Sequence, residues 1–291
     1  MRVTWREVGN VRVAALVDAD ADLADQLAEH FPEIPVDALA TTSELAPAIV
    51  GAGGTWHLFV RAWLLLHPGG VILVDTGVGG PRAPAAGWFP VSGKLHEALR
   101  EAGVTADQVD TVVITHVHDD HVGGVVTDDD HPAVAFPAAR YLIQQADLDH
   151  QRELAREDAE ERLIWDRLLQ PLLEAGVVDA LDGDRVLSDA IELRRAPGHT
   201  PGHQVVRVSS HGERLLLAGD TFNHPLQLGH PDWPSGTDVR PAAAAETRRS
   251  VLATLLSNPG TTLAPTHFDA PFGQVVSGPR GLASWRPHLD V

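Results

Sequence analysis

The sequence contains no cysteine, and this absence excludes whole classes of chemistry. Disulfides, thiolate metal sites, iron–sulfur clusters and cysteine nucleophiles all require a thiol. Tyrosine is nearly absent as well, since Tyr141 is the only one in 291 residues. Basic residues are scarce: 22 Lys and Arg stand against 40 Asp and Glu, so the formal net charge is −18. A chain this acidic repels phosphate backbones and anionic lipid, and we therefore expect no nucleic-acid partner and no membrane partner.

Long hydrophobic runs are missing too. The longest, residues 62–66 and 71–74, end at His67 and Asp75 and fall far short of the roughly 18 residues of a membrane span. The first ten residues are charged and hold no apolar stretch of the kind found in signal peptides, so we expect a cytoplasmic protein. At roughly 100–200 residues per domain the length fits one large domain or two small ones, and no repeat or linker-like segment divides it.

What the sequence does contain is a series of short apolar runs that predict β-strands. They cover residues 56–66, 70–74, 111–114, 134–135, 141–143, 191–193, 204–208, 214–218 and 262–264. Apolar residues at helical spacing predict helices over 94–102, 147–174 and 242–256, and the Ala- and Asp-rich stretch 17–28 is interpreted as a polar helix. Because strands and helices interleave, the sequence predicts a single α/β domain with mixed sheets.

Histidine is abundant, with 16 residues, and the placement of these residues is informative. Five of the predicted strands run into a His or an Asp, namely Asp75, His116, His199, Asp220 and His267. Loops at strand ends are where α/β folds place their chemistry. The sequence therefore indicates one site built from several strand ends.

The densest cluster is the segment 115–121, Thr-His-Val-His-Asp-Asp-His, which is followed by Val122 and two glycines. It is too polar for a buried strand, because imidazoles and carboxylates are costly to bury without partners. As a loop it can direct His116, His118, Asp120 and His121 at one point; a solvated turn is the alternative interpretation. The His and Asp residues after three later strands would complete a ligand set for two divalent ions without any thiolate.

These motifs resemble the metallo-β-lactamase-fold hydrolases, whose signature is His-x-His-x-Asp-His followed by His, Asp and His after later strands. The match follows the family's order from about Val71 to His267. The resemblance implies an α/β fold, a four-layer αββα sandwich with two mixed β-sheets. It implies that residues 1–291 form a single metallo-β-lactamase-like domain, with 1–55 as an N-terminal extension packed on it.

The resemblance also implies two divalent metal ions per chain. We expect Zn²⁺, and iron, manganese and cobalt also suit His and carboxylate ligands. The implied ligands are His116, His118 and His199 for the first ion, Asp120, His121 and His267 for the second, and Asp220 as a bridge. Asp75 matches an early family Asp and is expected to orient a ligand imidazole. His203 matches no ligand position and is interpreted as a structural turn residue.

Such a ligand set implies a dinuclear metal-dependent hydrolase. Two such ions would supply a hydroxide at neutral pH for attack on an ester-type bond, because metal binding lowers the pKa of water to about 7. They would also supply positive charge for the developing oxyanion. Asp120 would lie beside the hydroxide and pass a proton to the leaving group, which makes it the expected catalytic residue.

Within the family, the spacing and the run Ala-Pro-Gly-His-Thr-Pro-Gly-His at 196–203 look most like quorum-quenching lactonases, so we expect a small-molecule lactone as substrate. Arylester or phosphotriester hydrolysis, glyoxalase II-like thioester hydrolysis and a non-catalytic binding role stay open as alternatives. The missing thiol excludes β-lactamase subclasses with a Cys ligand, and the acidic charge disfavours nucleases. Many relatives form homodimers, so a homodimer is open here too.

The substrate contacts follow less directly from the resemblance. Many such lactonases carry a Tyr three residues after the bridging Asp, where this chain has Asn223. The candidate substrate-binding residues are Phe222, Asn223 and His224, together with Trp88 and Phe89 on a loop that could form a lid. Asn223 or His224 could donate a hydrogen bond in place of the Tyr. The alternative for the aromatic residues is packing in the core.

Overall fold

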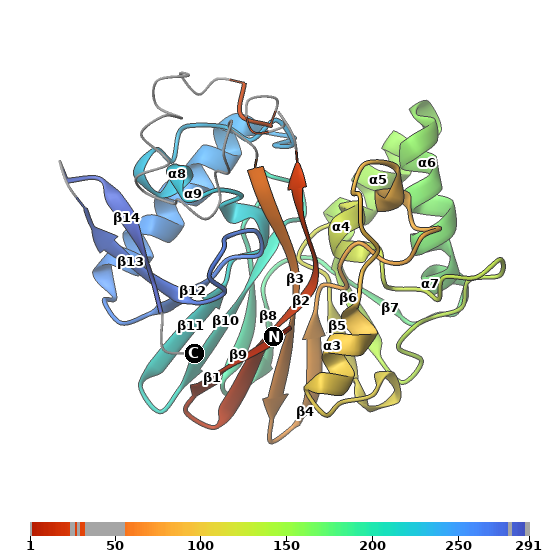
Figure 1. Cartoon of the computed structure of the whole chain (residues 1–291), viewed down its shortest axis with the longest axis horizontal. Helices are drawn as coiled ribbons and strands as arrows, with labels where there is room; N and C mark the ends of the chain where they lie inside the picture. Colours follow the sequence, from red (N-terminus) through yellow and green to blue (C-terminus); the bar gives the residue numbers. More distant parts are fainter. Residues whose placement is uncertain (1, 24–26, 28–29, 33–55, 279–280, 289–291) are drawn as a thin grey trace.

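The computed structural model describes residues 2–23, 27, 30–32, 56–278 and 281–288. Two seven-stranded β-sheets lie face to face (Figure 1). The first sheet runs, in spatial order, through β1 (Val3–Val8), β2 (Val11–Leu23), β3 (Trp56–His67), β4 (Gly70–Val74), β5 (Thr111–Val113), β6 (Arg140–Gln144) and β7 (Val178–Leu181). Its pairs are antiparallel from β1 to β4 and parallel from β4 to β7.

The second sheet runs through β14 (Ala283–Pro287), β13 (Gly273–Ser277), β12 (Thr262–Ala264), β11 (Glu213–Leu217), β10 (Gln204–Ser210), β9 (Ile191–Arg195) and β8 (Arg185–Ser188). Among the pairs described for this sheet, β11 and β12 are parallel and the others antiparallel. Apolar residues that alternate along the strands fill the space between the sheets, where Trp63 and Phe272 meet with ring centroids 5.5 Å apart.

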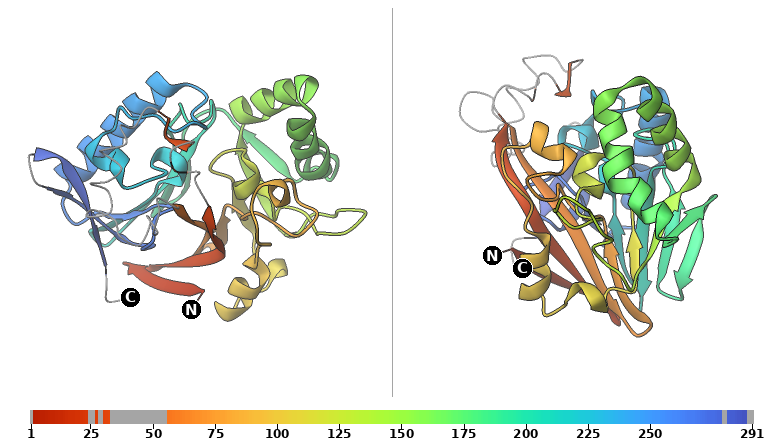
Figure 2. Two further views of the ribbon diagram at one scale, coloured as in Figure 1. Left: turned by 45° about the horizontal axis from the view of Figure 1, so that its top comes forward. Right: turned by 90° about the vertical axis from the view of Figure 1, so that its right-hand side faces the viewer.

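Helices cover both outer faces. They are α3 (Leu95–Glu101), α4 (Asp119–Val122), α5 (Gln145–Glu157), α6 (Ala159–Ile164), α7 (Gln170–Glu174), α8 (Leu226–Gly229) and α9 (Pro241–Ser257), with short turns at Pro84–Gly87, Ala106–Gln108, Trp165–Leu169 and Gly219–Thr221. Figure 2 shows α5–α7 (green) and α9 (blue) on opposite sides of the sheets. The expected four-layer αββα sandwich is confirmed. No helix in the described ranges is long and apolar enough to cross a membrane.

Two local predictions are wrong. Residues 17–23 are the end of β2 and not a helix, because Asp and Ala alternate there with the period of a strand; Ala19 and Leu23 are buried while Asp20 is exposed. Residues 24–26 and 28 of that stretch lie outside the described residues. The single helix expected over 147–174 breaks at Asp158, whose backbone is extended. Its side-chain oxygen Oδ1 caps α6 by accepting hydrogen bonds from the amides of Glu160 and Glu161.

The segment 1–55, expected as an extension, contributes β1 and β2 to the first sheet. Most of its residues after Leu23 lie outside the described ranges. The apolar pair expected at 134–135 forms no full strand, and Val134 makes a single bridge with Val126. For the site, the decisive feature is that β4, β5, β11 and β12 deliver the loops after them to one end of the sandwich (Figure 1).

Candidate metal centre

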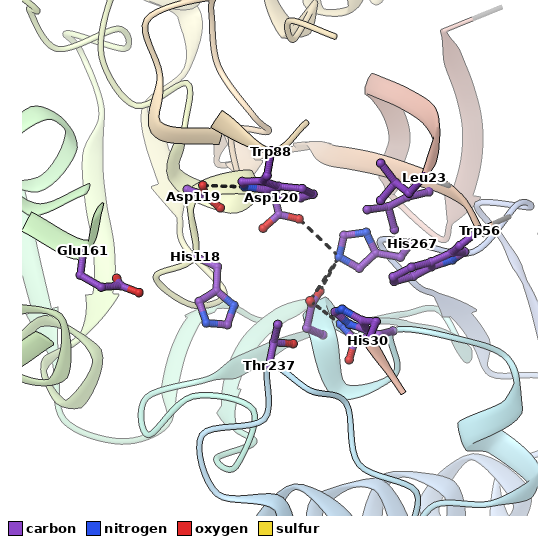
Figure 3. A pocket seen from close by; sticks show the side chains of 13 residues that line it. Leu23, His30, Trp56, Trp88, His118, Asp119, Asp120, Glu161, Thr237 and His267 are labelled. Atoms are coloured by element: carbon purple, nitrogen blue, oxygen red, sulfur yellow. Dashed lines mark hydrogen bonds and ion pairs between the residues drawn. The ribbon is translucent and has the colours of Figure 1, made fainter. Parts of the chain in front are cut away.

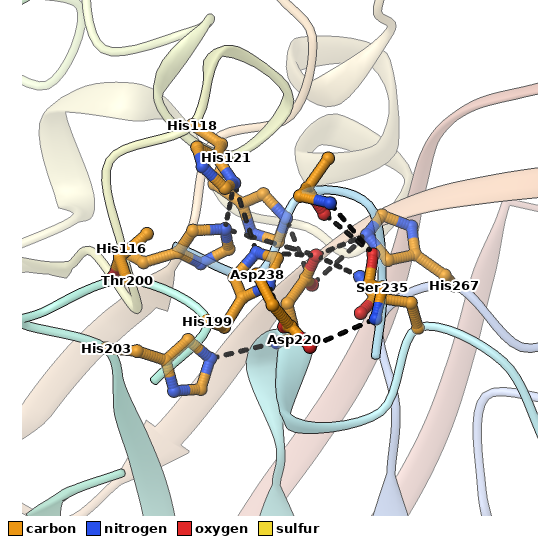
Figure 4. Close-up of polar contacts among 12 residues, drawn as sticks. His116, His118, His121, His199, Thr200, His203, Asp220, Ser235, Asp238 and His267 are labelled. Atoms are coloured by element: carbon orange, nitrogen blue, oxygen red, sulfur yellow. Dashed lines mark hydrogen bonds and ion pairs between the residues drawn. The ribbon is translucent and has the colours of Figure 1, made fainter. Parts of the chain in front are cut away.

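Three imidazoles from two distant loops converge at this end of the sandwich (Figure 4). His116 Nε2 lies 3.0 Å from His118 Nδ1, and His199 Nε2 lies 3.1 Å from the same atom. After β5 the chain bends at Thr115 and His116, and the backbone is extended at His118, the residue before α4. This path brings the rings of His116 and His118 together. We call His116, His118 and His199 the first trio.

A second set of ligand atoms lies beside the first. The short helix α4 turns the chain so that Asp120 and His121 meet His267, which follows β12. Asp120 Oδ2 lies 3.6 Å from Nε2 of His121 and 3.6 Å from Nε2 of His267. All three residues are buried. We call Asp120, His121 and His267 the second trio.

The Asp220 carboxylate lies between the two trios. Its Oδ1 is 3.2 Å from His121 Nε2 and 3.1 Å from His267 Nε2. Its Oδ2 is 3.5 Å from His199 Nε2 and 4.0 Å from His116 Nε2. One carboxylate therefore reaches both trios, which is the arrangement expected of a bridge.

These residues fit divalent cations. Within each trio, and within the group His116, His121 and Asp220, the ligand atoms lie within 4.8 Å of one another. His121 Nε2 and Asp220 Oδ1 are buried and 3.2 Å apart, yet neither makes a hydrogen bond among the described residues. Buried polar atoms normally make a hydrogen bond, and a cation between these two atoms would satisfy both. Imidazole nitrogens with carboxylate oxygens are a donor set that zinc, iron, manganese and cobalt accept.

The protonation state of His116 and His118 favours this chemistry. Burial, and then the neighbouring imidazoles, lower the pKa of His116 and of His118 well below the ordinary value. Both rings are therefore neutral and keep a lone pair for a cation. In the second trio burial acts to lower the pKa of His121, but the carboxylates of Asp120, Asp220 and Asp75 outweigh it and raise that pKa.

Asp75 lies where the expected orienting role requires it. Its Oδ2 is 2.9 Å from His121 Nδ1, and its carboxylate accepts hydrogen bonds from the Thr115 amide and hydroxyl, both at 2.8 Å. With a proton on Nδ1 held by Asp75, Nε2 is the His121 atom that faces the second trio, and a cation bound there would displace the proton that the raised pKa favours. Asp75 has a φ of 61°, an uncommon backbone state that Asp tolerates better than most residues.

A second carboxylate of this kind, Asp238, does not stand out in the sequence. Its Oδ1 lies 3.1 Å from His199 Nδ1, and its Oδ2 accepts hydrogen bonds at 3.0 Å from both Arg248 and the Ser235 amide. Arg248 is 1% exposed and comes from α9. A buried ion pair from another layer of the fold therefore fixes the ring of His199.

Two further buried residues hold the ligand loops together. Asp147, at the start of α5, accepts hydrogen bonds from the Val117 amide and the Thr200 hydroxyl, so it joins the two loops of the first trio. Arg61 of β3 donates to the backbone carbonyls of Thr266, Phe268 and Asp269 around His267. Burial lowers the pKa of Arg61 to about 9. Both residues act on the backbone that presents the ligands.

Most of the chain matches a known protein family. A family model described as the metallo-beta-lactamase superfamily matches residues 56–267. The chain belongs to this superfamily. The matched residues include both trios, Asp220 and Asp75, which form the candidate His and Asp metal sites.

Individual relatives are distant. The chain is 26% identical over 195 residues to an N-acyl homoserine lactonase of Bacillus thuringiensis, covering 62% of this chain and 69% of the relative. It is 27% identical over 162 residues to a hydroxyacylglutathione hydrolase of Aeromonas salmonicida, covering 55% of this chain and 45% of the relative. The matched region thus spans less than half of that hydrolase.

Among solved structures, the chain is similar to AidC, a dizinc quorum-quenching lactonase in complex with a product, with a TM-score of 0.84, 23% identity and coverage of 99% and 98% of the two chains. It is also similar to the hydrolase AbOPH, with a TM-score of 0.83, 22% identity and coverage of 98% and 97%. At these identities the likeness shows the fold.

A cavity of about 320 Å³ opens beside the metal centre (Figure 3). His118, Asp120, Asp220 and His267 form its polar floor. Its other lining residues are Leu23, His30, Trp56, Leu58, Trp88, Asp119, Glu161, Asn223 and Thr237. Burial, and then Asp120, raise the pKa of Asp119 to about 7, although Trp88 Nε1 donates a hydrogen bond to Asp119 Oδ2 at 2.8 Å.

The structure distributes the candidate substrate-binding residues unevenly. Trp88 and Asn223 line the cavity, and Trp88 is 40% exposed. Phe89 and Phe222 are buried in the core beside the second sheet. His224 is fully buried, with its ring centroid 5.7 Å from that of Phe31. His203, interpreted as structural, donates from Nδ1 to the Ala196 carbonyl at 3.1 Å and accepts from the Asp220 amide at 3.0 Å.

Proposed function

We propose that this chain is a dinuclear zinc-dependent hydrolase that opens the ester bond of a small neutral lactone. The observation that carries this proposal is the wall of the cavity beside the metal centre. Leu23, Trp56, Leu58 and Trp88 make one part of it apolar, and among the described residues no Lys or Arg lines it. A volume of about 320 Å³ accommodates a small molecule with a short apolar arm.

The charges of the wall distinguish between substrate classes. Glu161 lies on the cavity wall and would repel an anionic substrate such as a glutathione thioester. Asp119, whose pKa is raised to about 7, would add to this repulsion as the pH rises above 7. An uncharged lactone or ester meets no such repulsion. The similarity to an N-acyl homoserine lactonase and the fold shared with AidC support the same choice. Aryl esters and phosphotriesters are also uncharged, so they belong in the test.

The residues of the chain have distinct parts in this proposal. Two divalent cations held by the trios would supply a water of lowered pKa and an electrophile for the carbonyl oxygen. Asp120 lines the cavity and is placed to carry a proton to the leaving alkoxide. Asp75 and Asp238 hold the imidazoles of His121 and His199 in the tautomer whose Nε2 is free.

The test is proton release in a weakly buffered indicator solution. Zinc-loaded protein is offered an N-acylated γ-lactone, an aryl ester, a phosphotriester and an S-acyl glutathione, with a chelated sample as control. We expect chelator-sensitive turnover that is fastest on the lactone. Asp120→Asn should lower kcat by roughly 100-fold or more, while Asp232→Asn, an exposed Asp in an ion pair with Arg249, should keep it. Turnover that survives chelation, or a preference for the anionic thioester, would contradict the proposal.

A further inference from the structure

The side chain of Asn223 contacts the bridging carboxylate. Its Nδ2 lies 2.6 Å from Asp220 Oδ2, and the two residues are 2% and 4% exposed. A carboxylate only accepts hydrogen bonds, so the amide nitrogen, and not the amide oxygen, must face it. The Nδ2 donor of Asn223, a candidate for a substrate contact, is therefore directed at Asp220.

Asn223 is itself held from a neighbouring helix. The backbone N–H of Asn223 donates to Gln227 Oε1 at 2.8 Å, and Gln227 Nε2 donates to the Trp233 carbonyl at 3.1 Å. Gln227 belongs to α8 and is fully buried. These hydrogen bonds fix the backbone from which the Asn223 side chain extends, while its Oδ1 is buried without a hydrogen-bond partner among the described residues.

The backbone of Asp220 has its own support. Its amide donates to His203 Nε2 at 3.0 Å, and His203 Nδ1 donates to the Ala196 carbonyl at 3.1 Å. The ring of His203 is therefore in the neutral tautomer that carries its proton on Nδ1. His203 thus holds the backbone of Asp220 in place, and Asn223 holds the orientation of the Asp220 carboxylate.

The turn of the carboxylate decides whether it can bridge. Oδ1 lies 3.2 Å from His121 Nε2, and Oδ2 is the oxygen nearest to His199, at 3.5 Å. Both oxygens lie close to His267 Nε2, at 3.1 and 3.2 Å. A rotation about the Cβ–Cγ bond would move both oxygens away from these positions at once. We propose that Asn223 is a positioning residue that holds the Asp220 carboxylate in the orientation needed to bridge two cations. The inference rests on the proposed dinuclear function and makes Asn223 a determinant of metal binding, not a substrate contact.

The experiment measures metal affinity directly. Apo protein is titrated with Zn²⁺ against a chromophoric chelator, and Co²⁺ is used to record the visible spectrum of the site. Asn223→Leu removes the amide at similar volume and should weaken the binding of at least one metal equivalent by about 10–100-fold, as loss of a group that orients a ligand typically does. Asn223→Asp would place two carboxylates in contact, so the loss of metal affinity in this variant should become larger as the pH rises.

The matched control is Asn10→Leu, which removes an exposed Asn that hydrogen-bonds Ser210 far from the site. Urea unfolding of each chelated variant checks the fold, and Asn223→Ser, whose side chain is too short to reach Asp220, replaces Asn223→Leu if that variant does not fold. A positioning role predicts altered Co²⁺ spectra and lower kcat with KM changed less than about twofold on each substrate. Unchanged metal affinity and spectrum, with KM raised for one substrate, would overturn the inference.

Failure of the inference differs visibly from failure of the proposed function. Titrations and Co²⁺ spectra need no turnover, so a chain that is silent on lactones still tests Asn223. Wild-type protein that bound no cation would overturn the proposed function and this inference together. Wild-type and Asn223→Leu proteins that bind two cations equally well while hydrolysing lactones would overturn the inference alone.

Discussion

Asp238→Asn is the change whose effect can be worked out furthest from the structure. On the Oδ2 side of Asp238 there are two donors, Arg248 and the Ser235 amide, and on the Oδ1 side there is one, His199 Nδ1. An Asn would turn its oxygen toward the two donors and its NH₂ toward His199. His199 Nδ1 would then have to accept, which moves its proton to Nε2, the atom that faces the first trio.

Two magnitudes follow. A protonated Nε2 cannot ligate, so metal affinity should fall by about 10–100-fold, equivalent to roughly 1.4–2.7 kcal/mol. Arg248 would also lose its counter-charge at a site where it is 1% exposed. Removing one partner of a buried ion pair costs about 3–5 kcal/mol, and the hydrogen bond that Asn retains places the expected loss at the lower end.

The two effects can be measured separately. Urea unfolding of chelated protein reports the ion-pair cost, and competition with a chromophoric chelator reports the metal term. Asp232→Asn is the matched control, because Asp232 pairs with Arg249 on the exposed surface, where such pairs contribute about 0–1 kcal/mol. If Asp238→Asn bound both metal equivalents with wild-type affinity, the tautomer argument would be refuted.

Three further outcomes are expected. Chelation should lower the free energy of unfolding by about 2.7 kcal/mol relative to protein with free metal at 100 times Kd, and a melting curve unaffected by chelator would contradict metal binding to the native state. Burial lowers the pKa of His224 from 6.5 to about 3, so the free energy of unfolding falls as the pH decreases from 6.5 toward 3. His224→Phe should remove about 2 kcal/mol of the stability loss that urea unfolding measures between pH 7 and pH 5. An unchanged pH profile of stability would contradict this. Arg61→Met should destabilise the chain by about 1–3 kcal/mol and weaken zinc binding in equilibrium dialysis. The control is Arg140→Met, which removes an exposed Arg that donates to the carbonyls of Gly176 and Val178. This control should leave zinc binding intact.

The ligand cluster could be predicted from the sequence because its members share a visible context. His116, His199, Asp220 and His267 each follow a short apolar strand, and the first motif is dense enough to be recognised without a structure. The structure brings them together as that pattern indicates. Asp75 also follows a strand, and its contact with His121 agrees with the expected orienting role.

The supporting residues carry no such context. Asp238 lies in an irregular loop 39 residues after His199, and Arg248 lies within α9, where an Arg usually faces solvent. Their roles arise only when α9 packs on the second sheet. The helix predicted at the end of β2 is wrong for the opposite reason: the composition is typical of a polar helix, but Ala and Asp alternate with the period of a strand. A helix there does not predict Leu23 in the cavity wall.

Each trio takes ligands from loops of both sheets, and this matters for the stability of a chain that has no cysteine and therefore no disulfide. His116, His118, Asp120 and His121 follow β5 of the first sheet, whereas His199, Asp220 and His267 come from loops of the second. A cation in the first trio would tie together residues such as His118 and His199, which are 81 positions apart. A disulfide closing a loop of that length restricts the unfolded chain by about 4.5 kcal/mol in the chain-entropy model. The cations would thus serve as reversible cross-links between the two halves, and metal supply would regulate the persistence of the fold as well as its chemistry.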